Sequence, residues 1–331
     1  MKASFLFVVL LAAGCGGAGV STSTPPSSVL IDTSLRSRPT PTPTPALAHH
    51  TILETDAADP ITLIRFMTAP DYAWPSGKIC CYPFSGTMFA LEPSETIFLL
   101  QGGNAFSEVA PPYPPTSTSG PSGSLQSTTD ASWATFAANG TLFVADYIGN
   151  AVRIYAPPYL QAPITNVTRA VDQPIWVGVD AAADLFVENA GTSAVTEYAR
   201  PYTGPPIATI SIGNLHGSTR ASAAVDSVGN LFVIDPTVPA VRVYSPPYRS
   251  TPNATVTKGV TSPQALAADS DDSLYVLNVV KGTPAPNNYH YPVTSTMVKY
   301  SPPFTGAPKM SVTWNGWDNG DNFPGPFLVS P

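Results

Sequence analysis

The stretch NAVRIYAPPY, residues 150–159, ends an alternating apolar segment with two prolines and a tyrosine. Proline has no N–H to donate to a β ladder, so it stops strand pairing. The same ending recurs as VAPPY, YARPY, YSPPY and YSPPF, which close at residues 113, 202, 248 and 304, and more loosely as TAPDY, which closes at residue 72. Successive copies are 41, 46, 43, 46 and 56 residues apart. A period of about 40–50 residues is typical of β-propeller blades.

Each unit contains four short apolar segments separated by turn sequences. In the unit around Tyr248 they span residues 221–226, 230–235, 240–244 and 253–257. The second segment carries an aromatic residue in every complete unit: Phe98, Phe143, Phe186, Phe232 and Tyr275. Four strands per unit form one blade, with the proline pair ending the third strand near the rim, where free sheet edges must be blunted. We expect the aromatic residue after the prolines to pack over the joint between blades.

The repeats predict an all-β, six-bladed β-propeller with four-stranded blades over residues 49–331. Five units are complete, with first strands near residues 87, 134, 176, 222 and 265. A sixth unit is split between the chain ends. The C-terminal GPFLVSP supplies its first strand, and residues 50–83 supply the other three. Pairing the last strand with the first three closes the ring and leaves no open edge.

The repeat itself resembles a known family. The pattern D-x-x-G-N-L-F-V-x-D followed by x-V-R-V-Y is similar to the NHL repeat, with matches at Asp226, Gly229, Asn230, Phe232, Asp235, Arg242 and Tyr244. Over about residues 50–331 the chain resembles bacterial NHL-type six-bladed propellers. Their superfamily includes gluconolactonase-like, TolB-like and streptogramin-lyase-like proteins. This resemblance implies the fold and leaves the function open, because propellers host many unrelated activities.

The N-terminal sequence MKASFLFVVLLAAGCGG predicts export. Lys2 precedes an apolar run, residues 5–13, that is too short to span a bilayer and is typical of a secretory signal. AAGC resembles the bacterial lipobox, with Cys15 as the lipidated residue; an ordinary signal cleaved near Gly14 is the alternative. We therefore expect a signal peptide at 1–15, a disordered Ser/Thr/Pro-rich tether at 16–48, and a lipoprotein anchored at the outer membrane or cell surface of a bacterium.

Charge and cysteine content exclude some classes of protein. The net charge is −7 and only 11% of residues are charged, without Lys/Arg clusters, which argues against a nucleic-acid partner. Apart from Cys15, the cysteines are the adjacent pair Cys80 and Cys81, which give neither a disulfide framework nor zinc spacing. A bond between the two is conceivable. The alternative is that they are strand neighbours facing opposite sides.

Two columns of polar residues recur with the blades, and we interpret both as structural. The first comes just before the turn between first and second strands, where a carboxylate caps its own turn; a ring of carboxylates around a cation is the alternative. It comprises Glu92, Asp180, Asp226 and Asp269. The second column ends the second strands. There we expect Asp146 to pair with Arg153, and Asp235 with Arg242, across neighbouring strands.

Two departures from the repeat are the candidate binding site. Residues 279–295 are an insertion between second and third strands, and residues 314–325 are an enlarged connection into the closing strand. Exposed aromatics beside amides and carboxylates suit a sugar or a peptide. The candidates are Tyr289, His290, Tyr291, Trp314, Trp317, Asp318 and Asp321, with Phe323 nearby. Packing of Trp314 and Trp317 on the closing seam is the alternative. DNGDN lacks the full spacing of a calcium loop, so no metal is assigned, and calcium stays a minor alternative.

The sequence favours a monomeric binding or scaffold module without a cofactor, whose ligand is a protein, a peptide or a glycan on one propeller face. The alternative is a metal-dependent lactonase or lyase, which the superfamily resemblance implies. In that case His216, in the loop NLHGST, and Asp235 are the catalytic candidates. The identity of the ligand and the existence of any catalysis are open at this stage.

Overall fold

The computed structural model describes residues 52–58, 61–67, 77–82, 88–100, 103–111, 122–213, 222–283, 291–318 and 327–329. All of these residues lie within one compact unit, Thr44–Pro331. Strands are the regular elements of this part of the chain, which confirms the all-β class. Among the described residues, no helix is long and apolar enough to cross a membrane.

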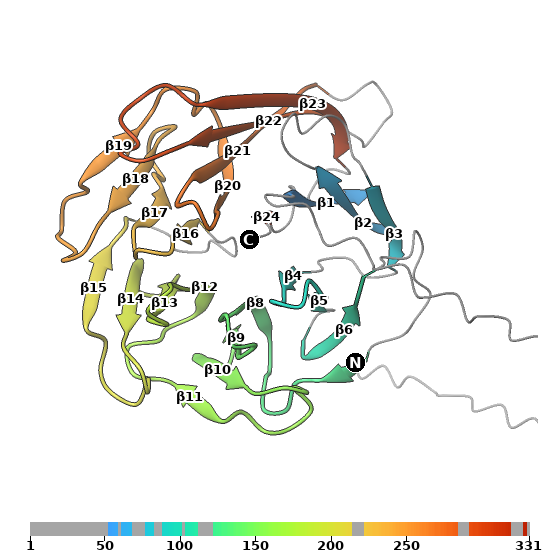
Figure 1. The fold of residues 1–331 in the computed structure, drawn as a ribbon, viewed down its shortest axis with the longest axis vertical. Coiled ribbons are helices and arrows are strands. Elements are labelled where there is room, and N and C mark those ends of the chain that lie inside the picture. The colour runs from blue at the N-terminus through green and yellow to red at the C-terminus, as the bar shows by residue number, and fades with distance from the viewer. Residues whose placement is uncertain are drawn as a thin grey trace, which may run out of the picture. The chain divides into compact units, whose positions relative to one another are not determined.

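Five consecutive blades surround a common axis, each a sheet of four antiparallel strands in chain order, with the first strand innermost (Figure 1). Blade 1 is β4 (Met88–Leu91), β5 (Ile97–Leu100), β6 (Ala105–Val109) and β7 (Gly123–Ser124). Blade 2 is β8 (Ala131–Phe136), β9 (Leu142–Asp146), β10 (Ala151–Tyr155) and β11 (Thr165–Val167). Blade 3 is β12 (Pro174–Val179), β13 (Leu185–Asn189), β14 (Ala194–Tyr198) and β15 (Ala208–Ser211). Blade 4 is β16 (Ala223–Val225), β17 (Leu231–Ile234), β18 (Val241–Tyr244) and β19 (Ala254–Val256). Blade 5 is β20 (Pro263–Ala268), β21 (Leu274–Lys281), β22 (Tyr291–Tyr300) and β23 (Met310–Asp318).

A further sheet joins the two ends of the chain. Its order is β24 (Phe327–Val329), β1 (Ile52–Ala58), β2 (Ile61–Met67) and β3 (Gly77–Tyr82). Leu328 of β24 lies opposite Leu53 of β1, so the predicted pairing of the C-terminal strand with the N-terminal strands does occur. Next to blade 5, β24 contacts β20 and β1 contacts β23. We call this the terminal sheet.

The expectation of six blades is corrected to five. The prediction counted the split unit as an equal of the five complete ones because it supplies the same number of apolar segments. The terminal sheet is instead assembled from distant parts of the chain, because its inner strand β24 comes from the C-terminus and its other three strands come from the N-terminal part. The five repeated units are the blades, and they position the residues discussed below.

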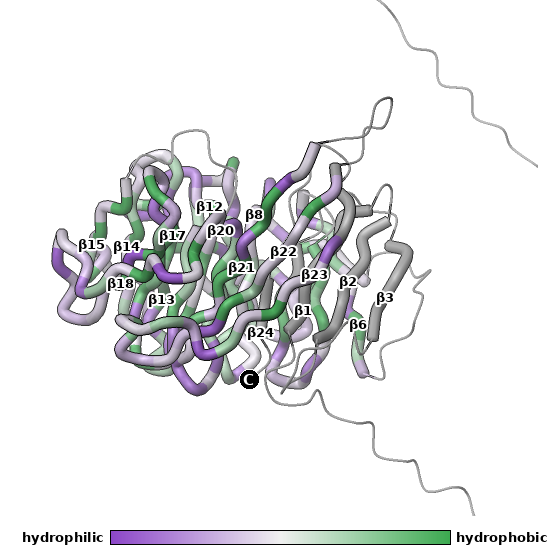
Figure 2. Tube along the Cα trace, turned by 90° about the horizontal axis from the view of Figure 1, so that it is seen from above, coloured by the Kyte–Doolittle hydropathy of each residue, from purple (hydrophilic) through white to green (hydrophobic). Residues whose placement is uncertain are grey.

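The second strand of each blade is mostly apolar and largely buried because neighbouring blades cover both of its faces. In β9 all five residues, Leu142–Asp146, are buried, and the same holds for β13. Strands buried on both sides read as continuous apolar runs rather than as alternating patterns. Figure 2 shows the hydrophobic residues along the blade strands and the hydrophilic ones mainly in the connections. The core therefore consists of layers between blades.

The aromatic residue that follows the prolines seals the joint with the preceding blade, as predicted. In each case its ring packs edge-on against the second-strand Phe of that blade. The pairs and centroid distances are Tyr159–Phe98 at 5.7 Å, Tyr202–Phe143 at 5.6 Å, Tyr248–Phe186 at 5.9 Å and Phe304–Phe232 at 4.9 Å. The Tyr202 hydroxyl also donates to the Ala183 carbonyl, 2.6 Å away, in the first turn of its own blade. The peptide bond before the last proline is cis in all four described copies.

The tyrosine before the prolines makes a second link between units. Its hydroxyl donates to a carbonyl in the connection that arrives from the preceding blade. Tyr198 donates to the Arg169 carbonyl at 2.5 Å, and Tyr300 donates to the Lys258 carbonyl at 2.5 Å. The tyrosine, the prolines and the following aromatic residue thus contact both the core of the preceding blade and the connection that arrives from it.

Candidate functional site

The first column of carboxylates caps turns, as predicted. Asp226 Oδ1 accepts the N–H of Asn230 at 2.7 Å and that of Val228 at 3.2 Å. Asp180 Oδ1 accepts the Asp184 N–H at 2.8 Å. Among the described residues, no group of three or more His, Cys, Asp and Glu side chains could hold a metal ion. These acids therefore shape turns and do not form a cation ring.

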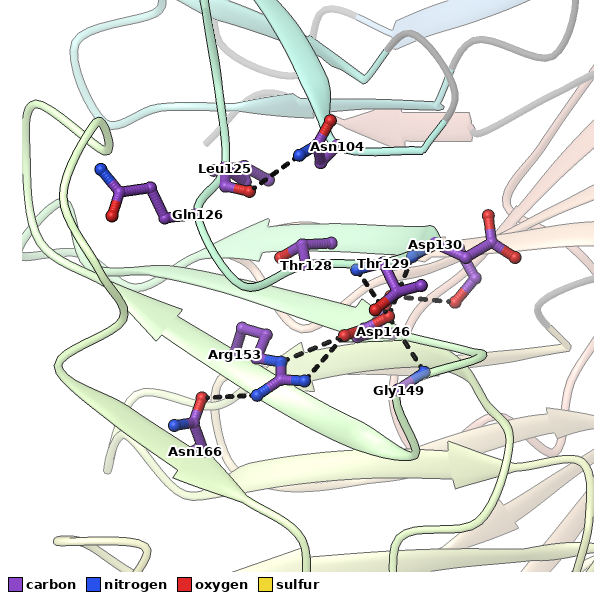
Figure 3. A network of polar contacts seen from close by, with 12 residues as sticks. Asn104, Leu125, Gln126, Thr128, Thr129, Asp130, Asp146, Gly149, Arg153 and Asn166 are labelled. Atoms are coloured by element: carbon purple, nitrogen blue, oxygen red, sulfur yellow. Dashed lines mark hydrogen bonds and ion pairs between the residues drawn. The ribbon is translucent and has the colours of Figure 1, made fainter.

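The second column anchors the connections between blades, and Asp146 shows how (Figure 3). Its Oδ1 accepts the N–H groups of Thr129 and Asp130, in the connection from blade 1, at 3.1 and 2.9 Å. It also accepts the Gly149 N–H at 3.2 Å. Its Oδ2 receives Arg153 Nε at 3.1 Å and Nη2 at 3.0 Å. This confirms the predicted ion pair and gives it a structural role.

Asp235 also pairs with an arginine, and its described partners lie within its own blade. Its Oδ2 lies 2.6 Å from Arg242 Nη2, and its Oδ1 accepts the N–H and the hydroxyl of Thr237 at 2.8 and 2.6 Å. Burial opposes the ionisation of Asp235, but the hydrogen bonds from Thr237 and Arg242 outweigh it and hold its pKa below the ordinary value. A carboxylate with both oxygens occupied and a lowered pKa is a poor general base. The other catalytic candidate, His216, lies outside the described residues.

A cavity of about 380 Å³ lies on the axis and is lined by the first strands of the five blades. Small residues such as Ala134, Gly178 and Ala224 line much of it, with Trp133 and Trp176 among them. Glu92 is the titratable residue in this described lining, and its Oε1 accepts the Tyr159 hydroxyl at 2.7 Å. The cavity thus offers an apolar wall rather than a set of ionic ligands.

Sequence reasoning missed Glu188 in β13. This side chain is completely buried, at the position where the other blades have Leu100, Ala145, Ile234 and Leu277. Its carboxyl group accepts the Ser222 N–H at 2.9 Å and the Ser222 hydroxyl, which reach it from blade 4. Burial raises the pKa of Glu188 to about 7, although the Ser222 hydrogen bonds act in the opposite direction. A single acid in an otherwise apolar column was the signal that could have found it.

Within the predicted insertion at 279–295, residues 279–281 and 291–295 lie in strands. β9 and β13 end at Asp146 and Asn189, but β21 continues to Lys281, three residues past the equivalent Asn278. β22 begins at Tyr291, and Lys281 lies opposite Val293. The strands lengthen because each added residue finds a ladder partner. We call residues 279–281, 291–295 and 314–318 the blade 5 extension.

The extension contains part of the predicted site. Trp314 is 7% exposed and packs with Tyr275, Leu277 and Met297 within blade 5, so it is a buried core residue rather than an exposed platform. The backbones of Tyr291 and Asp318 lie opposite each other, and Trp317 lies opposite Pro292. The remaining candidates, Tyr289, His290, Asp321 and Phe323, lie outside the described residues, and the Cys80 and Cys81 side chains are also not described.

Comparison with known proteins supports the fold. No protein-family description matches the chain, and no curated protein matches it. A protein of unknown function from Bacteroides caccae is similar in structure, with a TM-score of 0.52 and 13% identity over 85% of this chain and 98% of that chain. Virginiamycin B lyase from Staphylococcus aureus matches with a TM-score of 0.45 and 10% identity over 69% of this chain and 83% of that chain. At these identities the likeness concerns the β-propeller fold alone.

Proposed function

We propose that the protein is an exported, lipid-anchored binding module whose contact surface is the blade 5 extension. The observation that supports this most directly is the lengthening of three neighbouring strands in one blade of an otherwise regular repeat. β21, β22 and β23 span 8, 10 and 9 residues. A repeated scaffold with one enlarged element is a common way of presenting a binding surface.

The extension presents a polar face. Thr294 and Asn315 are exposed and share a hydrogen bond of 3.1 Å across β22 and β23, and the hydroxyls of Thr296 and Thr313 lie 3.0 Å apart. Val280, near the tip of β21, is 52% exposed. Mixed polar and apolar atoms on a rigid sheet suit a protein or peptide partner.

The experiment replaces Val280, Thr294 and Asn315, which are exposed in the extension, by Lys. Purified wild type and variant are used to capture proteins from the envelope fraction of the source cells, and mass spectrometry identifies them. We expect proteins enriched by the wild type to be lost with the variant. Ile148→Ser, in the β9–β10 turn of blade 2, is the matched control and should retain them. An unchanged set would refute the assignment of the contact surface.

The lactonase or lyase alternative has less support. Asp235 is saturated by Arg242 and Thr237, and the described residues offer no metal-ligand cluster. The residues described therefore do not fit a divalent metal site. Titration with Ca²⁺, Mg²⁺ and Zn²⁺, followed by thermal unfolding, tests this preference, because a rise of several degrees at micromolar metal would reverse it.

A further inference from the structure

The outermost strand of blade 5 is unusually long. β23 has 9 residues, whereas the outer strands β7, β11, β15 and β19 have 2, 3, 4 and 3. In the described sheets, β23 pairs with β22 on one side and with no described strand on the other, and β1 of the terminal sheet contacts it without pairing. Proteins usually blunt such edges with short strands, prolines or charges, because an edge is a template for another strand. Residues 310–318 contain no proline, and Asp318 at the end is their single charged residue.

The register shows which backbone groups face the open edge. The Gly282 N–H donates to the Pro292 carbonyl at 2.7 Å, so Pro292 directs its backbone groups toward β21. Backbone direction alternates along a strand, so Val293 and Ser295 face β23. Their partners in β23 are Gly316 and Trp314, which therefore face β22. By the same alternation, the N–H and C=O groups of Ser311, Thr313, Asn315 and Trp317 point outward.

The two faces beside this edge differ. Ser311, Thr313 and Asn315 expose their side chains on one face, whereas Met310 and Val312 are half-buried on the other. A strand added here would place alternate side chains beside Met310 and Val312 and the others in solvent. The edge thus fits an extended segment that is apolar at alternate positions and free of proline.

We propose that the edge of β23 binds an extended peptide segment of a partner protein as a fifth strand of blade 5. This rests on the proposed binding function and names the partner class and the mode of recognition. A second copy of the chain is the less suitable occupant, because two molecules of net charge −7 repel each other.

The test uses a phage library of random decapeptides selected against the chain without its signal peptide. Recovered peptides are synthesised, and fluorescence anisotropy measures their affinity for wild type, Thr313→Pro and Thr313→Ala. Proline at 313 removes an outward N–H and leaves the β22 ladder intact, as edge strands tolerate. Thr313→Ala keeps the N–H and is the matched control. Far-UV circular dichroism and thermal unfolding verify that both variants fold.

We expect Thr313→Pro to weaken binding at least tenfold and Thr313→Ala to change it less than threefold. N-methylation of alternate peptide residues should abolish binding in one frame and spare it in the other, because only one set of N–H groups faces β23. Peptides insensitive to Thr313→Pro would overturn strand addition while leaving the binding function intact. If no peptide is recovered, strand addition is refuted too. The capture of envelope proteins described above then tests the binding function independently. A concentration-dependent dimer abolished by Thr313→Pro would show that the occupant is a second copy and refute the proposal.

Discussion

Replacing Asp146 by Asn tests whether the ion pair in blade 2 is a structural anchor. Asn retains the shape and the Oδ1 atom that accepts N–H groups from Thr129, Asp130 and Gly149. It removes the charge opposite Arg153, whose side chain is only 17% exposed. Blades 3 and 5 already carry Asn189 and Asn278 at this position, so the backbone accommodates the amide.

The expected cost follows from the loss of one partner of a largely buried pair. Such losses cost about 3–5 kcal/mol when the remaining charge is fully buried. Partial exposure of Arg153 lets water replace some of the interaction, which leaves about 2–3 kcal/mol. In a domain of this size that loss lowers the melting temperature by roughly 4–8 °C.

The double variant Asp146→Asn/Arg153→Thr reproduces the arrangement of blade 3, where Asn189 Nδ2 donates to the Thr196 hydroxyl at 3.0 Å. We expect it to recover at least half of the lost stability. Urea unfolding of the four proteins of the cycle, each without residues 1–15, measures the coupling free energy. A loss below about 1 kcal/mol for Asp146→Asn, or no recovery in the double variant, would contradict the structural role derived from these contacts.

Three further predictions concern Glu188, Tyr202 and Cys15. In the folded protein the pKa of Glu188 is raised from 4.5 to about 7. Between about pH 4.5 and 7, Glu188 therefore keeps its proton in the folded state but loses it in the unfolded state. The contribution of Glu188 to the free energy of unfolding consequently falls as the pH rises through this range. Glu188→Gln removes this contribution, and urea unfolding across that range should show a smaller decline with pH than in the wild type; parallel curves would contradict the assignment. Tyr202→Ala deletes the ring that packs against Phe143 and the hydrogen bond to Ala183, and should lower the free energy of unfolding by about 3–4 kcal/mol. Tyr202→Phe deletes only the hydrogen bond and should lower it by about 1 kcal/mol. Urea unfolding measures both. Cys15→Ala should move the protein from the membrane pellet to the soluble fraction and abolish labelling by radioactive palmitate, and persistent labelling would show that Cys15 is not the lipidated residue.

The repeat was predictable from sequence because its signals are local and recur. The proline endings, the second-strand aromatics and the pairing of Asp146 with Arg153 each follow from one unit and are confirmed in the blades. The blade count was not predictable in this way, since matching segments do not show how distant chain ends assemble. The extension was misread as a loop because Gly282 and Pro292 resemble loop residues, yet they form a hydrogen-bonded pair.

Glu188 was missed for a different reason. Polar site residues are expected in loops, whereas Glu188 lies within a second strand whose neighbours are mostly apolar. Only the structure shows that the carboxyl group of Glu188 meets Ser222 of the next blade, because that contact joins residues 34 positions apart. An alignment of the units shows Glu188 as the one acidic residue at its position, but it does not show that Ser222 is its hydrogen-bond partner.

The aromatic joints make the units interchangeable. Each complete unit supplies a second-strand ring to the unit that follows it and, with one described ring such as Tyr202 or Phe304, docks on the unit before it. Any two such units therefore fit each other, whichever pair is placed in sequence. Gene duplication or deletion of a whole unit would preserve every one of these contacts, so the circumference of the ring, rather than the fit between neighbours, limits how many units the chain can carry.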